Sequence, residues 1–225
     1  RMPPQKRSYT VPELDVTGMK DYRELDARYY QPVFTREIQI VRGSGSRVWD
    51  ADGREYLDLV AGIAVCSTGH CHPEVVEAIT RQARELIHCS NLYYVPGQGE
   101  LAAELSRITG MGKVFLANSG AEATDGAIKL ARVRTGRKRF VAFTHGFHGR
   151  TLGSLAVTHK PAIREPFEPL EPKCTFVEYG DLDGLRKAVD SDTAGIFVEP
   201  IQGEAGIIIP PEGFLEGVRE ICDAK

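Results

Sequence analysis

From residue 113 to the last residue, short apolar runs typical of strands alternate with segments of helical periodicity. This alternation constrains the fold more than any other feature of the sequence. Strands separated by helices usually pair in parallel, and the helices then cover the faces of the sheet. We therefore predict an α/β domain with a mostly parallel sheet, whose strands are expected at residues 113–117, 139–143, 174–179 and 194–200.

The residues before this alternation predict a different structure. Residues 1–20 are polar and contain prolines, so we expect them to be loosely ordered. Residues 37–59 contain alternating runs with turn signals at Gly43–Gly45 and Asp52–Gly53, which predict a small β-meander. Apolar residues at helical spacing predict two further helices, over residues 73–86 and 99–108.

Composition and charge argue against several classes of partner. The 225 residues carry a formal net charge of -3, which gives no electrostatic case for nucleic acid or for an anionic membrane. No apolar run approaches the roughly 18 residues that a membrane helix needs, and the first residues lack the apolar core of a secretory signal. The five cysteines show no paired spacing, which favours free thiols and a cytoplasmic protein.

The first candidate site is Asn118–Glu122, where an apolar run ends and a helix is expected to begin. Ser119 and Glu122 have the spacing of a capping box, and Gly120 would let a ligand approach the backbone closely. The free N–H groups at such a helix start can bind a phosphate, although an ordinary capped helix has the same pattern. The segment is neither a Walker A loop nor a Rossmann fingerprint, so a phosphate here would belong to another kind of cofactor.

The second candidate is the glycine-rich segment 145–151, with the sequence HGFHGRT. Phe147 is able to stack on a planar heterocycle, and Arg150 has the fork geometry that grips a carboxylate. Taken alone, the segment is better explained as a surface loop. We expect no metal here or at residues 69–73 (GHCHP), because neither histidine spacing suits a tetrahedral ion.

The third candidate is the segment 199–206, EPIQGEAG, which follows an expected strand directly. The carboxyl ends of strands line the ligand crevice in open α/β sheets. The carboxylates of Glu199 and Glu204 and the amide of Gln202 are therefore candidates for binding a polar substrate or a nearby arginine. A satisfied network within the loop explains the segment equally well.

These segments together resemble the class III aminotransferases of the fold type I pyridoxal-phosphate enzymes. The resemblance runs from about Arg36 to the last residue, and it is carried by GHCHPEVVEAI, SNLYY, NSGAEATDGAIKLAR, FHGRTLGSLAVT and VEPIQGEAG, in that order. It implies a three-layer αβα sheet domain that binds pyridoxal 5'-phosphate. It also implies that residues 1–72 belong to the small domain, and that residues 73–225 are the large domain, truncated on its C-terminal side.

The resemblance implies roles for individual residues at the cofactor. Gly120 and Ala121 match the backbone pair that holds the cofactor phosphate, with Ser119 just before them. Phe147 matches the aromatic residue that stacks on the pyridine ring.

It implies substrate contacts as well. Arg150 matches the arginine that binds a substrate carboxylate, and Glu204 matches the glutamate that pairs with a switchable arginine in some members. Glu199 matches a polar neighbour of the same pocket. Ornithine δ-aminotransferases tend to carry a tyrosine where this chain has Ile63, and an apolar residue suits a substrate whose α-amine is acylated.

Two elements of the family's chemistry are missing from these 225 residues. The aspartate that pairs with the pyridine nitrogen lies in a DE-x-Q motif, and this sequence has none. None of its lysines has the context of the family's Schiff-base lysine. We expect both residues beyond residue 225, assign no catalytic residue to this chain, read both of its ends as cut, and predict that it is inactive alone.

The segment LVAGIAVCSTGHCHP resembles the acetylornithine group within the family. We therefore expect transfer of the terminal amino group of N-acetylornithine, or a related acylated diamino acid, to 2-oxoglutarate, in arginine or lysine biosynthesis. The family also implies a homodimer for the complete protein. Ornithine and 4-aminobutyrate aminotransferases, a same-fold amino-acid racemase and a non-catalytic truncated partner subunit stay open as alternatives.

Overall fold

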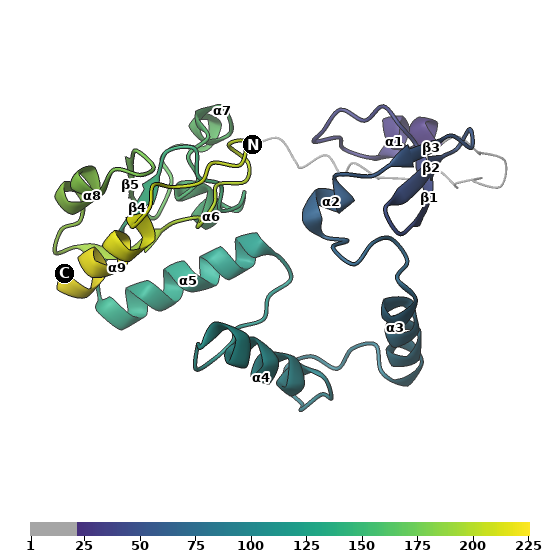
Figure 1. Cartoon of the computed structure of the whole chain (residues 1–225), viewed down its shortest axis with the longest axis horizontal. Helices are drawn as coiled ribbons and strands as arrows, with labels where there is room; N and C mark the ends of the chain where they lie inside the picture. Colours follow the sequence, from purple (N-terminus) through teal and green to yellow (C-terminus); the bar gives the residue numbers. More distant parts are fainter. Residues whose placement is uncertain (1–21) are drawn as a thin grey trace, which may run out of the picture. The chain divides into compact units, whose positions relative to one another are not determined.

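The computed structural model describes residues 22–225, so the prediction for residues 1–20 lies outside the described residues. The chain divides into two units, Arg1–Tyr94 and Val95–Lys225 (Figure 1). The predicted domain boundary at residue 72 stays a prediction.

The N-terminal unit contains the predicted β-meander. Helix α1 (Tyr22–Tyr29) precedes three antiparallel strands, β1 (Ile40–Ser44), β2 (Arg47–Asp50) and β3 (Glu55–Leu57). Their order in the sheet is β1-β2-β3, so each strand pairs with its neighbour in sequence. Gly45 and Gly53 adopt positive φ at the two turns, which is why glycine occurs there.

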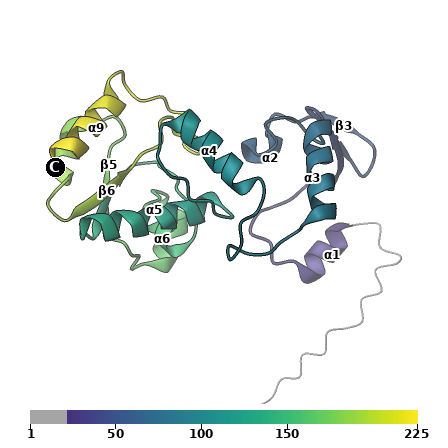
Figure 2. The ribbon, with the colours of Figure 1, turned by 90° about the horizontal axis from the view of Figure 1, so that it is seen from below.

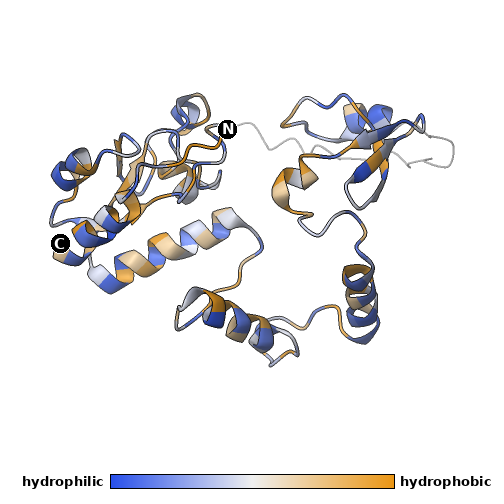
Figure 3. Cartoon of the chain, viewed as in Figure 1, coloured by the Kyte–Doolittle hydropathy of each residue, from blue (hydrophilic) through white to orange (hydrophobic). Residues whose placement is uncertain are grey.

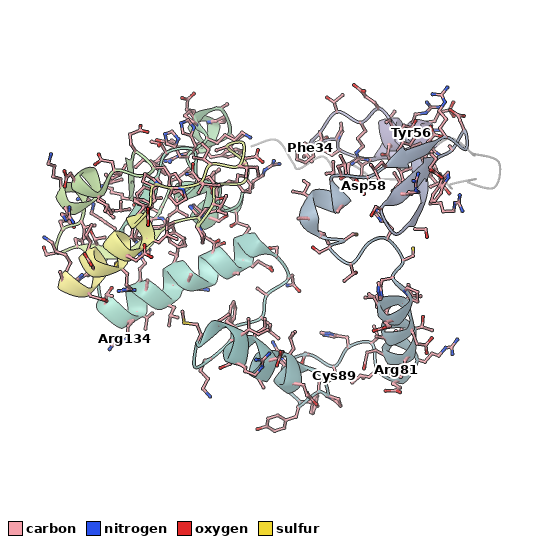
Figure 4. All side chains as sticks on the ribbon, viewed as in Figure 1. Phe34, Tyr56, Asp58, Arg81, Cys89 and Arg134 are labelled. Atoms are coloured by element: carbon pink, nitrogen blue, oxygen red, sulfur yellow. The ribbon has the colours of Figure 1, made fainter. Side chains whose placement is uncertain are left out.

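The short element α2 (Ala61–Ala64) has an unusual backbone. All four of its residues have φ between 50° and 65°, a region that non-glycine residues rarely adopt. The Asp58 carboxylate contacts the start of this element. Its Oδ1 accepts hydrogen bonds from the backbone N–H groups of Val60 and Ala61, both at 2.9 Å. Asp58 lies between β3 and this turn (Figure 4).

Two predicted helices are present near the boundary of the units. Helix α3 (Pro73–Glu85) begins with Pro73 in its first turn, where the missing N–H costs no hydrogen bond. Helix α4 (Gln98–Thr109) ends at Gly110, whose φ of 71° closes the helix in the left-handed conformation.

The C-terminal unit contains a parallel sheet of β4 (Arg139–Phe143), β5 (Cys174–Val177) and β6 (Thr193–Phe197). The order is β5-β4-β6, with Phe143 beside Val177 and Ala142 beside Phe197. The carboxyl ends of all three strands therefore lie at one edge of the sheet.

Helices cover both faces of this sheet. Figure 2 shows α9 (Phe214–Ala224) on one side of the strands and α5 (Gly120–Thr135) with α6 (Leu152–Ala156) on the other. Helix α8 (Leu182–Ala188) shares the face of α9, while α7 (Pro161–Arg164) and a 3-10 turn (Glu165–Phe167) follow α6.

Alternate residues of β4 feed two apolar cores. Val141 and Phe143 pack with α8 and α9, whereas Phe140 and Ala142 pack with Ile128 of α5. The predicted three-layer αβα arrangement is confirmed, and the strand predictions at residues 139–143, 174–179 and 194–200 are correct in position. Within the described residues, no helix is long and apolar enough to cross a membrane.

The strand predicted at residues 113–117 is not formed. A strand needs a hydrogen-bonded neighbour, and none of the described strands pairs with this segment. Phe115 instead lies against Gly126 of α5, where a Cβ would come within 2.9 Å of the ring.

Candidate active site

The N-terminus of α5 presents free backbone donors to open space. Ser119 caps the helix by accepting a hydrogen bond from Glu122 N (3.2 Å), and Glu122 Oε2 accepts one from Asn118 N (2.8 Å). Gly120 and Ala121 are the first two helical residues, so their N–H groups have no acceptor within the helix. A Cβ added at Gly120 would meet nothing within 4 Å, so the backbone there is open to a ligand.

The loop after β4 is attached directly to this helix. Thr124 Oγ1 of α5 donates to His148 O at 2.9 Å. Gly149, with a φ of 132°, approaches the helix so closely that a Cβ would lie 2.8 Å from that of Ala121 and 2.4 Å from Ser154 Oγ. The loop and the helix start therefore form one rigid corner, and only glycine fits at position 149.

Buried hydroxyl groups hold the loop from below. Thr158 is fully buried, and its Oγ1 accepts a hydrogen bond from His148 N at 2.8 Å. The same oxygen lies 3.1 Å from Gly149 O and 3.0 Å from Ser154 O. Burial lowers the pKa of the His148 imidazole, against the opposing charge of Glu199, so a neutral ring is favoured there.

The predicted ring and guanidinium groups lie together on this corner. Phe147 is half-buried and Arg150 is exposed, with the Arg150 guanidinium carbon 5.9 Å from the centre of the Phe147 ring. Glu199 fixes the backbone of Phe147, since its Oε1 accepts a hydrogen bond from Phe147 N at 2.8 Å. Its Oε2 accepts one from Gly203 N at 3.0 Å.

Glu199 therefore joins the loop after β4 to the loop after β6. Both of its carboxylate oxygens accept from backbone N–H groups, which accounts for a carboxylate at this position. Its predicted contact with substrate stays a prediction.

Glu204 lies in the same loop and forms an ion pair with Lys160. The Lys160 Nζ to Glu204 Oε1 distance is 2.5 Å. The hydrogen bond from Lys160 and its charge lower the pKa of the Glu204 carboxyl group, and the charge of Arg150 adds to this effect. Glu204 is therefore an anion near the guanidinium of Arg150.

Several contacts of the corner were not predicted from the sequence. Gln202 is 1% exposed, and its Nε2 donates to Thr144 O at 2.8 Å, while its Oε1 has no partner in the described structure. Tyr179 Oη donates to Glu199 O at 2.8 Å. Gln202 lies in the predicted segment 199–206, but no sequence pattern links Tyr179 or Lys160 to the site, because their partners lie 20 and 44 positions away.

The structure brings most of the predicted site residues together in the C-terminal unit: Ser119, Gly120, Ala121, Phe147, Arg150, Glu199 and Glu204. Ile63 lies in the N-terminal unit, on the left-handed turn, with 84% of its surface exposed. Its predicted role in substrate selection stays a prediction. The described residues contain no cluster of three or more metal-binding side chains.

Comparison with known proteins shows which family this chain resembles. The chain matches the family model described as aminotransferase class-III over residues 29–225. It is 55% identical over 206 residues to the acetylornithine aminotransferase of Methanopyrus kandleri, covering 90% of this chain and 53% of that protein. The acetylornithine aminotransferase of Methanosarcina mazei is 54% identical over 208 residues, covering 92% and 53%.

A solved structure shares the arrangement of elements. The crystal structure of the ornithine aminotransferase from Toxoplasma gondii ME49 is similar with a TM-score of 0.86 and 31% identity, covering 92% of this chain and 52% of that one. The present chain therefore spans about half the length of the proteins it matches.

The parallel sheet between two helical layers is the fold of the type I pyridoxal-phosphate enzymes. Within that class, the chain belongs to the class III aminotransferases.

The residues at the corner suit the cofactor of this family. Open N–H groups at Gly120 and Ala121 match a phosphate group, which binds well at a positive helix end. The Phe147 ring, fixed through its backbone by Glu199, supplies an apolar face for a planar heterocycle.

Proposed function

We propose that this chain is the cofactor-binding portion of an aminotransferase that acts on N-acetylornithine, or on a related acylated diamino acid, with 2-oxoglutarate as amino acceptor. The observation that carries the proposal is the corner between α5 and the loop after β4. There an open helix start, an aromatic ring and a guanidinium group lie within one rigid unit. The two acetylornithine aminotransferases at 54% and 55% identity support the substrate class.

Different residues of the corner would bind different parts of the cofactor. Backbone N–H groups of Gly120 and Ala121 would hold the phosphate of pyridoxal 5'-phosphate at the helix start. The Phe147 ring would supply an apolar contact for the heterocycle and limit its movement. When bound, the cofactor supplies an electron sink for the bonds at the amine-bearing carbon.

Arg150 orients each substrate in turn by binding its carboxylate. A guanidinium group donates two parallel hydrogen bonds to a carboxylate, which fixes direction as well as distance. Glu204 carries a negative charge close to Arg150 and is already paired with Lys160. This pairing limits the competition of Glu204 with the substrate carboxylate for Arg150.

The apolar side chain of Ile63 supports an acylated substrate. An acyl group on the α-amine leaves no ammonium to be paired, so an apolar contact costs less there than it would for a free ammonium, which would lose its hydration. An Ile63→Tyr variant of the full-length protein should shift the preference toward ornithine.

The complete protein is proposed to act as a homodimer in arginine or lysine biosynthesis. The lysine and the aspartate of the family's chemistry would come from the part of the protein outside these residues. The 225-residue chain alone is therefore proposed to be inactive.

The test is a donor panel with the full-length protein. We expect glutamate to form from 2-oxoglutarate with N-acetylornithine at a higher kcat/KM than with ornithine or 4-aminobutyrate. A preference for ornithine or 4-aminobutyrate would contradict the substrate assignment. Formation of D-amino acids without glutamate would indicate the racemase instead.

A further inference from the structure

Asp125 of α5 accepts a hydrogen bond from the residue that follows Arg150. Thr151 Oγ1 lies 2.7 Å from Asp125 Oδ2 and 2.8 Å from Ser154 Oγ. A carboxylate has no proton to donate, so the Thr151 hydroxyl donates to Asp125 and accepts from the Ser154 hydroxyl. The three groups form a directed chain from a fully buried serine to the helix that starts the phosphate site.

The backbone around Arg150 needs such an anchor. Gly149 directly before it has a φ of 132°, a conformation that a flexible glycine does not hold by itself. Thr151 directly after it is the N-cap residue of α6. A hydroxyl fixed at Thr151 therefore fixes the end of the segment that carries the guanidinium group.

A second observation points to the same carboxylate. Gly153 lies so close to Asp125 that a Cβ would stand 2.2 Å from Asp125 Oδ1, and Gly153 has no positive φ that would require glycine. The absence of a side chain at position 153 is thus explained by the space that the Asp125 carboxylate occupies.

We infer that Asp125 and Thr151 are positioning residues for the substrate carboxylate, because their hydrogen bond sets Arg150 at a fixed place relative to the phosphate site. The inference rests on the proposed function of Arg150. Asp125 lies in the same helix as Gly120 and Ala121, so one rigid element carries both the phosphate donors and the anchor of Arg150. Such coupling matters because a misplacement of about 1 Å in a binding group costs up to about a hundredfold in rate.

The test measures carboxylate binding apart from turnover. Glutarate, a dicarboxylate without an amine or a keto group, is titrated calorimetrically into the full-length, cofactor-loaded protein. Thr151→Val removes the hydroxyl at nearly constant volume, and Thr151→Ser restores it. Asp183→Ala, which removes an exposed carboxylate of α8, is the matched control for loss of a helical aspartate.

We expect Thr151→Val and Asp125→Ala to weaken glutarate binding roughly tenfold to a hundredfold, while Thr151→Ser and Asp183→Ala bind like the wild type. In turnover assays the first two variants should lower kcat/KM for 2-oxoglutarate by a similar factor, mainly through a raised KM. The absorbance of the bound cofactor should be the same in all variants. Gly153→Ala, whose Cβ displaces the carboxylate, should behave like Asp125→Ala.

Three results would overturn the inference: glutarate binding that is unchanged in Thr151→Val, equal loss in Thr151→Val and Thr151→Ser, or no glutarate binding by the wild type. A failure of the proposed function looks different. Glutarate binding would still depend on the hydroxyl at Thr151, but no amino donor would yield glutamate.

Discussion

At the scale of single residues, two glycines at the corner differ in the space that surrounds them. Gly149 has no room for a Cβ and has a φ of 132°, whereas a Cβ at Gly120 meets nothing. We expect Gly149→Ala to lower the free energy of unfolding of the full-length protein by about 1–3 kcal/mol or more, from strain and overlap. Gly120→Ala should leave stability within about 0.5 kcal/mol of the wild type.

Cofactor titration separates the two glycines further. Gly120→Ala places a methyl group where a phosphate would approach the backbone, so its affinity for pyridoxal phosphate should fall although the fold is intact. Urea denaturation and cofactor absorbance measure the two effects. If Gly120→Ala bound the cofactor as tightly as the wild type, the phosphate would not lie at the start of α5.

Glu199 is a second residue whose chemistry is fixed by its contacts. Both carboxylate oxygens accept from backbone N–H groups, of Phe147 and of Gly203. Glu199→Gln keeps the volume but turns one acceptor into a donor that faces an N–H group, which should destabilise the protein by about 1–3 kcal/mol. Glu178→Gln, directly after β5, is the control, and thermal denaturation is the measurement. Equal melting temperatures for both variants would contradict the role of Glu199.

At the scale of elements, the left-handed turn α2 depends on Asp58. Its carboxylate accepts from Val60 N and Ala61 N and lies 2.6 Å from His70 Nε2. The His70 hydrogen bond, followed by the backbone bonds, lowers the pKa of Asp58 from 3.8 to about 2. Figure 3 shows the apolar character of this turn.

A carboxyl group with a lowered pKa stabilises the folded state above its unfolded pKa, and this contribution is lost as the pH falls through the folded value. The stability advantage of the wild type over Asp58→Asn should therefore shrink between pH 3.8 and about 2. Urea unfolding of the full-length protein at several pH values measures this difference, with Asp52→Asn as the control. An advantage that is constant across this range would show that the Asp58 charge does not hold the turn.

The elements also show what the sequence can predict. Strand β4 was predicted because its apolar run is flanked by charged and turn residues. In the structure, both faces of this strand are buried. Residues 113–117 have an equally apolar run but form no strand, since pairing depends on a neighbour that the local sequence does not specify. The turn at α2 was missed for another reason, because left-handed alanine and isoleucine run against their local preferences.

The residues of the candidate site likewise divide into those that the local sequence predicts and those that only the fold brings in. Gly120 and Phe147 are recognisable because their motifs are contiguous in sequence. Lys160 is not, because its role comes from a contact with a residue 44 positions away. Asp125 is not recognisable either, because its partner Thr151 lies 26 positions away.

At the scale of the whole molecule, the 225-residue chain leaves apolar surface uncovered. Leu130 and Val133 on α5 are 70% and 86% exposed, and the labelled Arg134 beside them also points away from the sheet (Figure 4). We expect the isolated chain to self-associate, because association removes exposed apolar surface of this kind from water. Light scattering after size-exclusion chromatography checks this, with Leu130→Lys/Val133→Lys as the variant that should reduce association. A monodisperse monomer of the unmodified chain would contradict it.

The central claim is that the start of α5 and the loop after β4 together form the cofactor site of this aminotransferase. A crystal structure of the full-length protein with pyridoxal phosphate tests it most directly. The account predicts the phosphate within hydrogen-bonding distance of Gly120 N and Ala121 N, with the Phe147 ring against the heterocycle. A phosphate bound elsewhere, or a heterocycle with no contact to Phe147, would contradict it.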